Sequence, residues 1–217
     1  MEKKDTLNCK VVIVGDTGVG KTCLIERYIH NRYDENQKAT LVSSYTFKKI
    51  DIKAYNKSVS LDIWDTAGQE IYRSLSKNFY LGAAIGILVY DISSRESFNS
   101  IKEYWFEQLK NFGDENMIFA IVGNKIDLFQ NEQIPENEAR DYAKSMNAGF
   151  HLVSCKQRVG INDLFEDCVK KYLEKNKLTK SNNNDEKDNK RIVLDKIQTK
   201  KVKKQCILLD NPPNLFY

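Results

Sequence analysis

The stretch that decides the fold is CKVVIVGDTGVGKT, residues 9–22. Its first part is a short run of apolar and β-branched residues, and this pattern predicts a strand that is buried on both faces. The second part, GDTGVGKT (15–22), matches the spacing G-x-x-x-x-G-K-[ST] and leads into KTCLIERYIH (21–30), which we expect to be a helix. A glycine-rich loop between a buried strand and a helix is the context that a phosphate-binding loop requires.

The residue types in this loop suit phosphate. Glycines allow the backbone to wrap closely and to point N–H groups at phosphate oxygens, and the helix N-terminus adds a favourable dipole. We expect the Lys21 ammonium to contact the β- and γ-phosphates of a nucleotide and the Thr22 hydroxyl to ligate Mg²⁺. The alternative is a glycine turn that only joins strand to helix, and the complete spacing favours the phosphate site. The predicted nucleotide-binding residues here are Gly15, Asp16, Thr17, Gly18, Val19, Gly20, Lys21, Thr22 and Cys23.

The rest of the chain alternates between the two kinds of pattern. Expected strands are SSYTFKKIDI (43–52), SVSLDIWD (58–65), AAIGILVYDIS (83–93), MIFAIVGNK (117–125) and GFHLVSCK (149–156). Expected helices are 95–113 with Gly113 as C-cap, 135–147 with Pro135 in its first turn, and 160–175. We expect the strands at 43–52 and 58–65 to form an antiparallel pair. The chain is therefore predicted to be an α/β protein with a six-stranded, mostly parallel sheet, one antiparallel strand and helices on both faces.

The tetrapeptide NKID (124–127) indicates which base is bound. It follows a buried strand at its carboxyl end, the edge at which open α/β sheets bind ligands. The Asp127 carboxylate can accept two hydrogen bonds from guanine, from N1–H and from the 2-amino group, whereas adenine would leave it unpaired. We expect Lys125 to pack along the base and Asn124 to tie the loop together. An N-K-x-D match alone is weak, but it gains weight downstream of a phosphate loop.

A third motif, WDTAGQE (64–70), follows a predicted strand. We expect Asp65 to hold Mg²⁺ through water and Gly68 to offer its N–H to the γ-phosphate. Gln69 is the predicted catalytic residue, because its side chain can orient the attacking water. The alternative is that Asp65 caps a loop and that Gln69 is merely exposed.

With these three motifs in order, the chain resembles the Ras superfamily of small GTPases over about residues 8–173, and within it the Rab family. The Rab-like blocks are GDTGVGKTCLIERY, LDIWDTAGQE, FYLGAAIGILVYDIS and VGNKIDL, and TLVSSYTFKKIDI leans toward the endocytic branch. The resemblance implies a P-loop NTPase G domain that switches between GTP and GDP, hydrolyses GTP slowly and regulates membrane trafficking. It implies an exchange factor, a GTPase-activating protein and effectors as partners. Alternatives are a non-Rab Ras-like signalling GTPase, a guanine-nucleotide scaffold with negligible hydrolysis, and a P-loop kinase or ATPase.

Further site residues are implied by the resemblance alone. Thr40 matches the threonine that ligates Mg²⁺ and holds the γ-phosphate, so that the implied metal site is Thr22, Thr40 and Asp65. Tyr33 matches the aromatic residue that stacks over guanine. The segment that contacts the base from its other side is matched by Ser154, Cys155 and Lys156.

The resemblance also implies a surface for effectors. The aromatic residues that match it are Tyr45, Trp64 and Phe79, for which ordinary core packing is the open alternative. The chain departs from the family at Val42, Ile71 and Leu81, where a glycine, an arginine and an arginine are usual. We expect these departures to affect the choice of partners and to leave nucleotide binding intact.

Composition divides the chain into a near-neutral body and a basic tail. The net charge of the 217 residues is +4, and residues 174–217 alone hold 11 Lys/Arg against 6 Asp/Glu. We expect an N-terminal extension at 1–8, a small GTPase G domain at 9–175 and a flexible hypervariable tail at 176–217. The five scattered cysteines favour a reducing, intracellular setting over a disulfide framework or a zinc site.

The tail suggests contact with a membrane. Five lysines and no acidic residue lie within 196–206, a composition that suits an anionic membrane surface. CILL (206–209) would read as a prenylation signal at a chain end, but eight residues follow it, so prenylation after processing, palmitoylation of Cys206 and no lipid all stay open. No apolar run approaches the ~20 residues of a membrane-spanning helix. We expect a cytoplasmic monomer, peripheral on the cytosolic face of endomembranes with endosomes favoured, and no nucleic-acid partner.

Overall fold

The computed structural model describes most of the predicted domain. The described residues are 6–38, 40, 44–55, 57–66 and 77–176. The chain divides into two compact units, Met1–Leu173 and Glu174–Tyr217, and only residues 174–176 of the second are described. The predicted roles of Gly68, Gln69 and Cys206 therefore concern residues outside the described ones, as do those of Val42 and Ile71.

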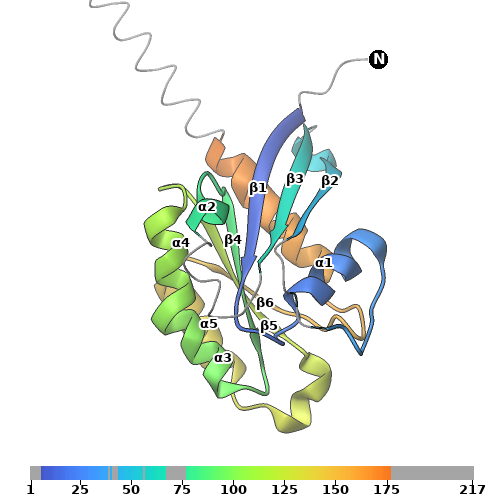
Figure 1. Ribbon diagram of the computed structural model, residues 1–217. Coiled ribbons are helices and arrows are strands. Elements are labelled where there is room, and N and C mark those ends of the chain that lie inside the picture. The colour runs from blue at the N-terminus through green and yellow to red at the C-terminus, as the bar shows by residue number, and fades with distance from the viewer. Residues whose placement is uncertain (1–5, 39, 41–43, 56, 67–76, 177–217) are drawn as a thin grey trace, which may run out of the picture. The chain divides into compact units, whose positions relative to one another are not determined.

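One six-stranded sheet organises the fold (Figure 1). Its strands are β1 (Thr6–Val14), β2 (Ser44–Ile52), β3 (Lys57–Asp65), β4 (Ile85–Asp91), β5 (Ile118–Asn124) and β6 (Gly149–Leu152). The order across the sheet is β2-β3-β1-β4-β5-β6; β2 pairs antiparallel with β3, and all other pairs are parallel. This confirms the predicted sheet. Strand β1 begins at Thr6 rather than at Cys9, because Thr6–Asn8 continue the pairing with Ser58–Ser60 of β3.

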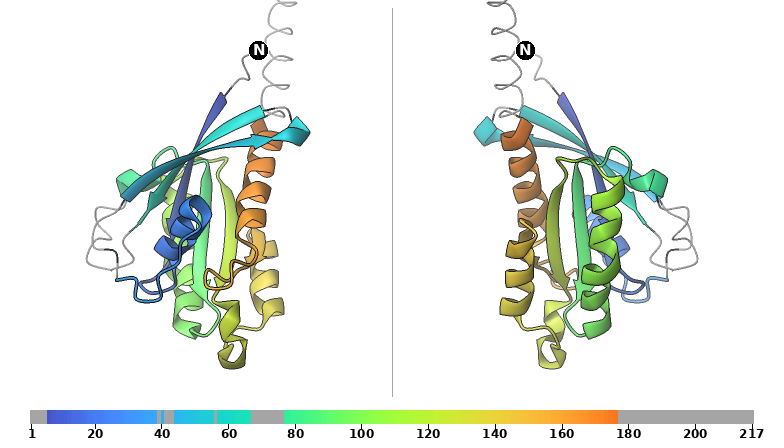
Figure 2. Two further views of the ribbon diagram at one scale, coloured as in Figure 1. Left: turned by 90° about the vertical axis from the view of Figure 1, so that its right-hand side faces the viewer. Right: turned by 90° about the vertical axis from the view of Figure 1, so that its left-hand side faces the viewer.

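Helices cover both faces of the sheet, as predicted (Figure 2). They are α1 (Lys21–His30), α2 (Lys77–Tyr80), α3 (Arg95–Ser100), a π-helical segment (Ile101–Trp105), α4 (Phe106–Phe112), α5 (Glu136–Ser145) and a last helix at 161–176. Side chains alternate along β1 between two apolar cores. Cys9, Val11 and Ile13 pack with α1 and the last helix, whereas Val12 and Val14 pack with α2 to α5.

The structure corrects the expected helix ends. The helix predicted at 95–113 is continuous but contains the π-helical segment, which no periodicity argument anticipated. Gly113 is the C-cap residue, as predicted; its backbone is extended (φ −82°, ψ −175°), and its N–H donates to the Leu109 carbonyl at 2.8 Å. Pro135 precedes α5 as its N-cap residue instead of lying in the first turn.

Three short elements within the described ranges were not predicted. They are helix α2 and two 3₁₀ segments, Lys53–Tyr55 between β2 and β3 and Ile126–Asn131 after β5. All three are too short for a periodic pattern to indicate them. Among the described residues, no helix combines the length and apolar character needed to cross a bilayer.

Candidate nucleotide-binding site

The predicted phosphate loop connects β1 to α1 and uses its glycines for close approach. Gly15 and Gly20 have φ angles of +143° and +97°, which L side chains rarely adopt. A Cβ atom at Gly15 would lie 2.2 Å from the Val89 carbonyl oxygen, and one at Gly20 would lie 2.4 Å from the amide nitrogen of Asn124. No side chain caps the N-terminus of α1, so its first backbone N–H groups are available to a ligand.

Lys21 lies within this loop and is almost completely buried. Its ammonium donates to the carbonyl oxygens of Gly15 at 2.8 Å and Asp16 at 2.9 Å. Burial lowers the pKa of Lys21 to about 8. An anionic phosphate beside the ammonium would favour its charged form and raise this pKa again.

The three predicted metal ligands come together beside Lys21. The Thr22 hydroxyl lies 2.6 Å from the Thr40 hydroxyl and donates to Oδ2 of Asp65 at 2.7 Å. Asp65 is only 2% exposed, and burial raises the pKa of its carboxyl group. Within the described part of the chain, its other oxygen, Oδ1, is buried and has no hydrogen-bond partner. The cluster therefore consists of oxygen atoms, and Oδ1 of Asp65 remains available as an acceptor or ligand.

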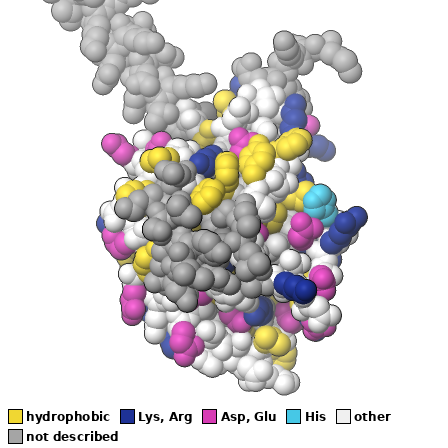
Figure 3. Space-filling model, viewed as in Figure 1, with side chains coloured by type: hydrophobic (Ala, Val, Ile, Leu, Met, Phe, Trp, Pro, Cys, Tyr) yellow, Lys and Arg dark blue, Asp and Glu magenta, His cyan; other side chains and the backbone are white. Residues whose placement is uncertain are grey.

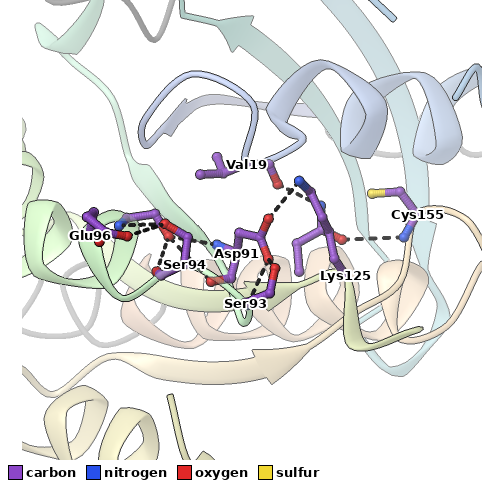
Figure 4. A network of polar contacts seen from close by, with 9 residues as sticks. Val19, Asp91, Ser93, Ser94, Glu96, Lys125 and Cys155 are labelled. Atoms are coloured by element: carbon purple, nitrogen blue, oxygen red, sulfur yellow. Dashed lines mark hydrogen bonds and ion pairs between the residues drawn. The ribbon is translucent and has the colours of Figure 1, made fainter. Parts of the chain in front are cut away.

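Asn124, at the end of β5, connects the phosphate loop to the loop at 154–156. Figure 4 labels its two partners, Val19 and Cys155. Its amide nitrogen donates to the Val19 carbonyl at 2.8 Å, and its amide oxygen accepts from the Cys155 N–H at 3.4 Å. Lys125 has a left-handed backbone (φ +66°), and its ammonium lies 2.7 Å from the Asp91 carboxylate at the end of β4. Two neighbouring strand ends are thereby held together at this edge of the sheet.

Asp127 lies in the 3₁₀ segment after β5, and a buried serine orients its carboxylate. The Ser154 hydroxyl donates to Oδ1 of Asp127 and accepts from the Gln157 N–H at 3.0 Å. Ser154 is fully buried, so this contact restrains the carboxylate from behind.

One cavity of about 360 Å³ joins these parts. The predicted residues that line it are Thr17, Gly18, Gly20, Lys21, Thr22, Cys23, Tyr33, Thr40, Asn124, Lys125, Asp127, Cys155 and Lys156. Gly15, Asp16, Val19, Asp65 and Ser154 are not among its lining residues; the contacts above place Gly15, Asp16 and Val19 in the loop, Asp65 beside Thr22 and Ser154 beside Asp127. Further lining residues, which the sequence did not single out, are Asp34, Glu35, Gln37, Lys38 and Leu128.

A polar contact bridges the segment after Tyr33 and the loop at 154–156. The Lys156 ammonium lies 2.7 Å from the Glu35 carboxylate. Arg27 of α1 supports both sides, because it donates to the Cys155 carbonyl at 2.8 Å and its guanidinium lies 5.5 Å from the centre of the Tyr33 ring. The sequence assigned no role to Glu35 or Arg27, so only the folded chain reveals this bridge.

The predicted effector residues form one aromatic row outside the cavity. The ring centres of Tyr45 and Trp64 are 5.2 Å apart, and those of Trp64 and Phe79 are 5.6 Å apart. Tyr45 is 53% exposed, whereas Trp64 and Phe79 are half-buried against the core. Hydrophobic side chains gather in a band on one face of the molecule (Figure 3). Tyr45 and Phe47 of β2 and, after α2, Leu81 are exposed. The row therefore both packs on the core and reaches the surface.

Comparisons with known proteins show the family to which the chain belongs. The model of the Ras family matches residues 10–174. Human Ras-related protein Rab-22A is 40% identical over 156 residues, which are 72% of this chain and 79% of the relative. Ras-related protein Rab-21 of Geodia cydonium is 38% identical over 174 residues (80% and 75%), and Ras-related protein Rab5A of Oryza sativa subsp. japonica is 36% identical over 167 residues (77% and 81%).

The fold and the cavity define a P-loop protein of the guanine-nucleotide-binding class. The chain belongs to the Rab family of the Ras superfamily, and its relatives support the endocytic lean of the sequence. It is a small GTPase that binds guanine nucleotide, hydrolyses GTP and regulates membrane trafficking. Membership of this family implies exchange factors, GTPase-activating proteins and effectors as its partners.

Proposed function

We propose that the cavity between the phosphate loop and the loop at 154–156 holds the guanine nucleotide of a GTP/GDP switch. The observation that carries this proposal is the placement of the cluster Thr22, Thr40 and Asp65 beside Lys21 at one cavity, which Asp127 also lines. Phosphates and base would then be held by chemically different ends of the same site. In this proposal residues 9–175 form the G domain and 176–217 the tail.

The oxygen cluster fits a magnesium ion. Mg²⁺ prefers oxygen ligands, and the cluster offers two hydroxyls and a buried carboxylate with an unpartnered oxygen. Burial raises the pKa of Asp65 despite the hydrogen bond from Thr22 and the nearby charge of Lys21, and a bound cation would favour the charged form of this carboxylate. We propose Thr22 and Thr40 as ligands and Asp65 as a ligand through water. When bound, Mg²⁺ would supply positive charge for the phosphate oxygens.

The base would lie between Asp127 and Tyr33. Asp127 keeps acceptor capacity for guanine, since a carboxylate has two oxygens and Ser154 engages only Oδ1. Lys125 and the Tyr33 ring would pack on the base, and Cys155 and Lys156 would close it from the other side. The thiol of Cys155 is compatible with contact to the base, because the backbone N–H of this residue, not its side chain, would bind the base.

Hydrolysis is proposed to depend on Gln69, with Gly68 contacting the γ-phosphate. In single-turnover assays we expect wild-type protein to hydrolyse GTP at roughly 10⁻⁴–10⁻³ s⁻¹. The variant Gln69→Leu should be slower by about tenfold or more, because leucine cannot orient water. Phosphate release from preloaded GTP measures both rates.

The matched control is Gln130→Leu, the same substitution at an exposed position of the 3₁₀ segment. It should hydrolyse GTP at the wild-type rate. Equal rates for wild type and Gln69→Leu would remove the proposed role of Gln69. Absence of phosphate release from wild type would favour the scaffold alternative, and tighter binding of ATP than GTP would favour a kinase or ATPase.

The proposed setting is the cytosolic face of endosomal membranes, reached as a monomer. The aromatic row Tyr45, Trp64 and Phe79 would bind effectors there. The lysine-rich segment at 196–206 would contact anionic lipid, and Cys206 is the candidate for a lipid anchor, since a basic patch alone binds weakly. Intact-mass analysis of protein from its native cell would show whether Cys206 carries a lipid.

The basic segment can be tested on vesicles that contain anionic lipid. In the full chain, Lys203→Gln with Lys204→Gln should weaken vesicle binding by about fivefold for each lysine at low salt. The control pair Lys177→Gln and Lys180→Gln changes the same charge outside the segment and should have a smaller effect. Equal losses for both pairs would mean that total charge, not this segment, directs binding.

A further inference from the structure

The helix that follows β4 contains one turn that is wider than an α-helical turn. Through residues Ile101–Trp105 it is π-helical, and the Phe106 N–H donates to the Ile101 carbonyl, five residues back. A π-helical turn accommodates an extra residue and often marks a functional site. The two residues at the end of this turn are both buried: Trp105 is 2% exposed and Phe106 is 7% exposed.

Trp105 uses its only polar group to reach the phosphate loop. Its indole N–H donates to Oδ1 of Asp16 at 2.8 Å, across 89 positions of sequence. The backbone carbonyl of Asp16 in turn accepts from the Lys21 ammonium at 2.9 Å. Two successive contacts therefore lead from the π-helical segment to the lysine that is proposed to bind phosphate.

Asp16 needs such an anchor. Its neighbour Gly15, and Gly18 two positions beyond it, both have positive φ, and glycine itself contributes little rigidity to a backbone. A hydrogen bond to a carboxylate is stronger than one between neutral groups, and burial of the indole strengthens it further. Gly15 and Asp16 are the loop residues whose carbonyl oxygens accept from Lys21. The hydrogen bond from Trp105 to the Asp16 side chain therefore restrains this part of the loop.

We propose that Trp105 is a positioning residue for nucleotide binding: its indole N–H holds Asp16, and through it the phosphate loop, in the conformation that retains nucleotide. The proposal rests on the proposed phosphate-binding role of this loop. Trp105 packs in the apolar core between the sheet and helices α2 to α5, and it does not line the cavity. It would act through Asp16 alone.

The test is the dissociation rate of a fluorescent GDP analogue. Trp105→Phe keeps an aromatic ring and removes the N–H donor, and we expect it to release GDP about tenfold faster than wild type. Asp16→Ala should accelerate release to a similar extent, and the double variant should be no faster than either single variant, because both remove the same contact. Asp16→Asn, which keeps an oxygen acceptor for the indole, should fall between wild type and Asp16→Ala.

A matched control separates positioning from loss of packing. Phe98→Leu changes another fully buried aromatic residue of the same helix, one that packs against Tyr90 and Tyr142. It should lower the melting temperature yet release GDP within about twofold of the wild-type rate.

Three results would overturn the proposal: a wild-type release rate in folded Trp105→Phe, additive effects of the Trp105 and Asp16 substitutions, or equal acceleration by Phe98→Leu. Circular dichroism establishes that each variant is folded. Failure of the wild-type protein to bind GDP would instead contradict the proposed function, so the two failures are distinguishable.

Discussion

Replacing Asp127 with alanine is expected to weaken GTP binding by roughly 10²–10⁴-fold, because guanine would lose two hydrogen bonds to a charged acceptor. Each such bond contributes about 1.5–3 kcal/mol, and about 1.4 kcal/mol corresponds to a factor of ten. The Ser154 hydroxyl holds the Asp127 carboxylate in one orientation before the base binds, and this preorganisation increases the affinity that the substitution removes. Equilibrium titration with GTP measures the change.

The same variant should lose discrimination at the 2-position of the base. Inosine triphosphate lacks the 2-amino group, so wild-type protein should prefer GTP to it, whereas Asp127→Ala should bind the two alike. The control Asp141→Ala removes an exposed carboxylate of α5 that lies 3.6 Å from the Lys144 ammonium, and it should behave as wild type. Retained preference for GTP in Asp127→Ala would assign guanine recognition to another residue.

The second large effect is expected at Thr22. Thr22→Val keeps the shape of the side chain and removes the hydroxyl that contacts both Thr40 and Asp65. We expect the affinity of the GDP complex for Mg²⁺ to fall by about 100-fold, since a ligand is lost and the two remaining groups are no longer held together. The measurement is the rate of GDP release over a range of free Mg²⁺ concentrations. The variant should need a higher Mg²⁺ concentration than wild type to slow GDP release by half.

Thr46→Val, the same change on β2, is the control and should leave the magnesium dependence where it is in wild type. Thr22→Val also removes the donor to Oδ2 of the buried Asp65, so the nucleotide-free protein should lose roughly 1–3 kcal/mol of stability. An unchanged response to Mg²⁺ in a folded Thr22→Val protein would mean that the hydroxyl cluster is not the metal site.

Local sequence determined a large part of this protein. The strand–loop–helix unit at 9–30 is specified by neighbouring residues, since glycines at 15 and 20 permit the positive φ angles of the loop between the apolar strand and the helix. The alternation of apolar runs and amphipathic segments predicted the parallel sheet, and the pair at 43–65 predicted its antiparallel edge. Motif residues from separate parts of the chain, among them Lys21, Asn124 and Asp127, line one cavity, because the carboxyl ends of parallel strands share one edge.

Tertiary structure alone decided the contacts between distant segments. The bond from Trp105 to Asp16, the pairing of Lys125 with Asp91 and that of Lys156 with Glu35 join residues that no local pattern connects. The π-helical turn at Ile101–Trp105 was likewise indicated by no periodic pattern, and it brings Trp105 to the core position from which its indole reaches Asp16. Local sequence specifies backbone conformation and burial, whereas the positions of long polar side chains depend on what the folded chain places opposite them.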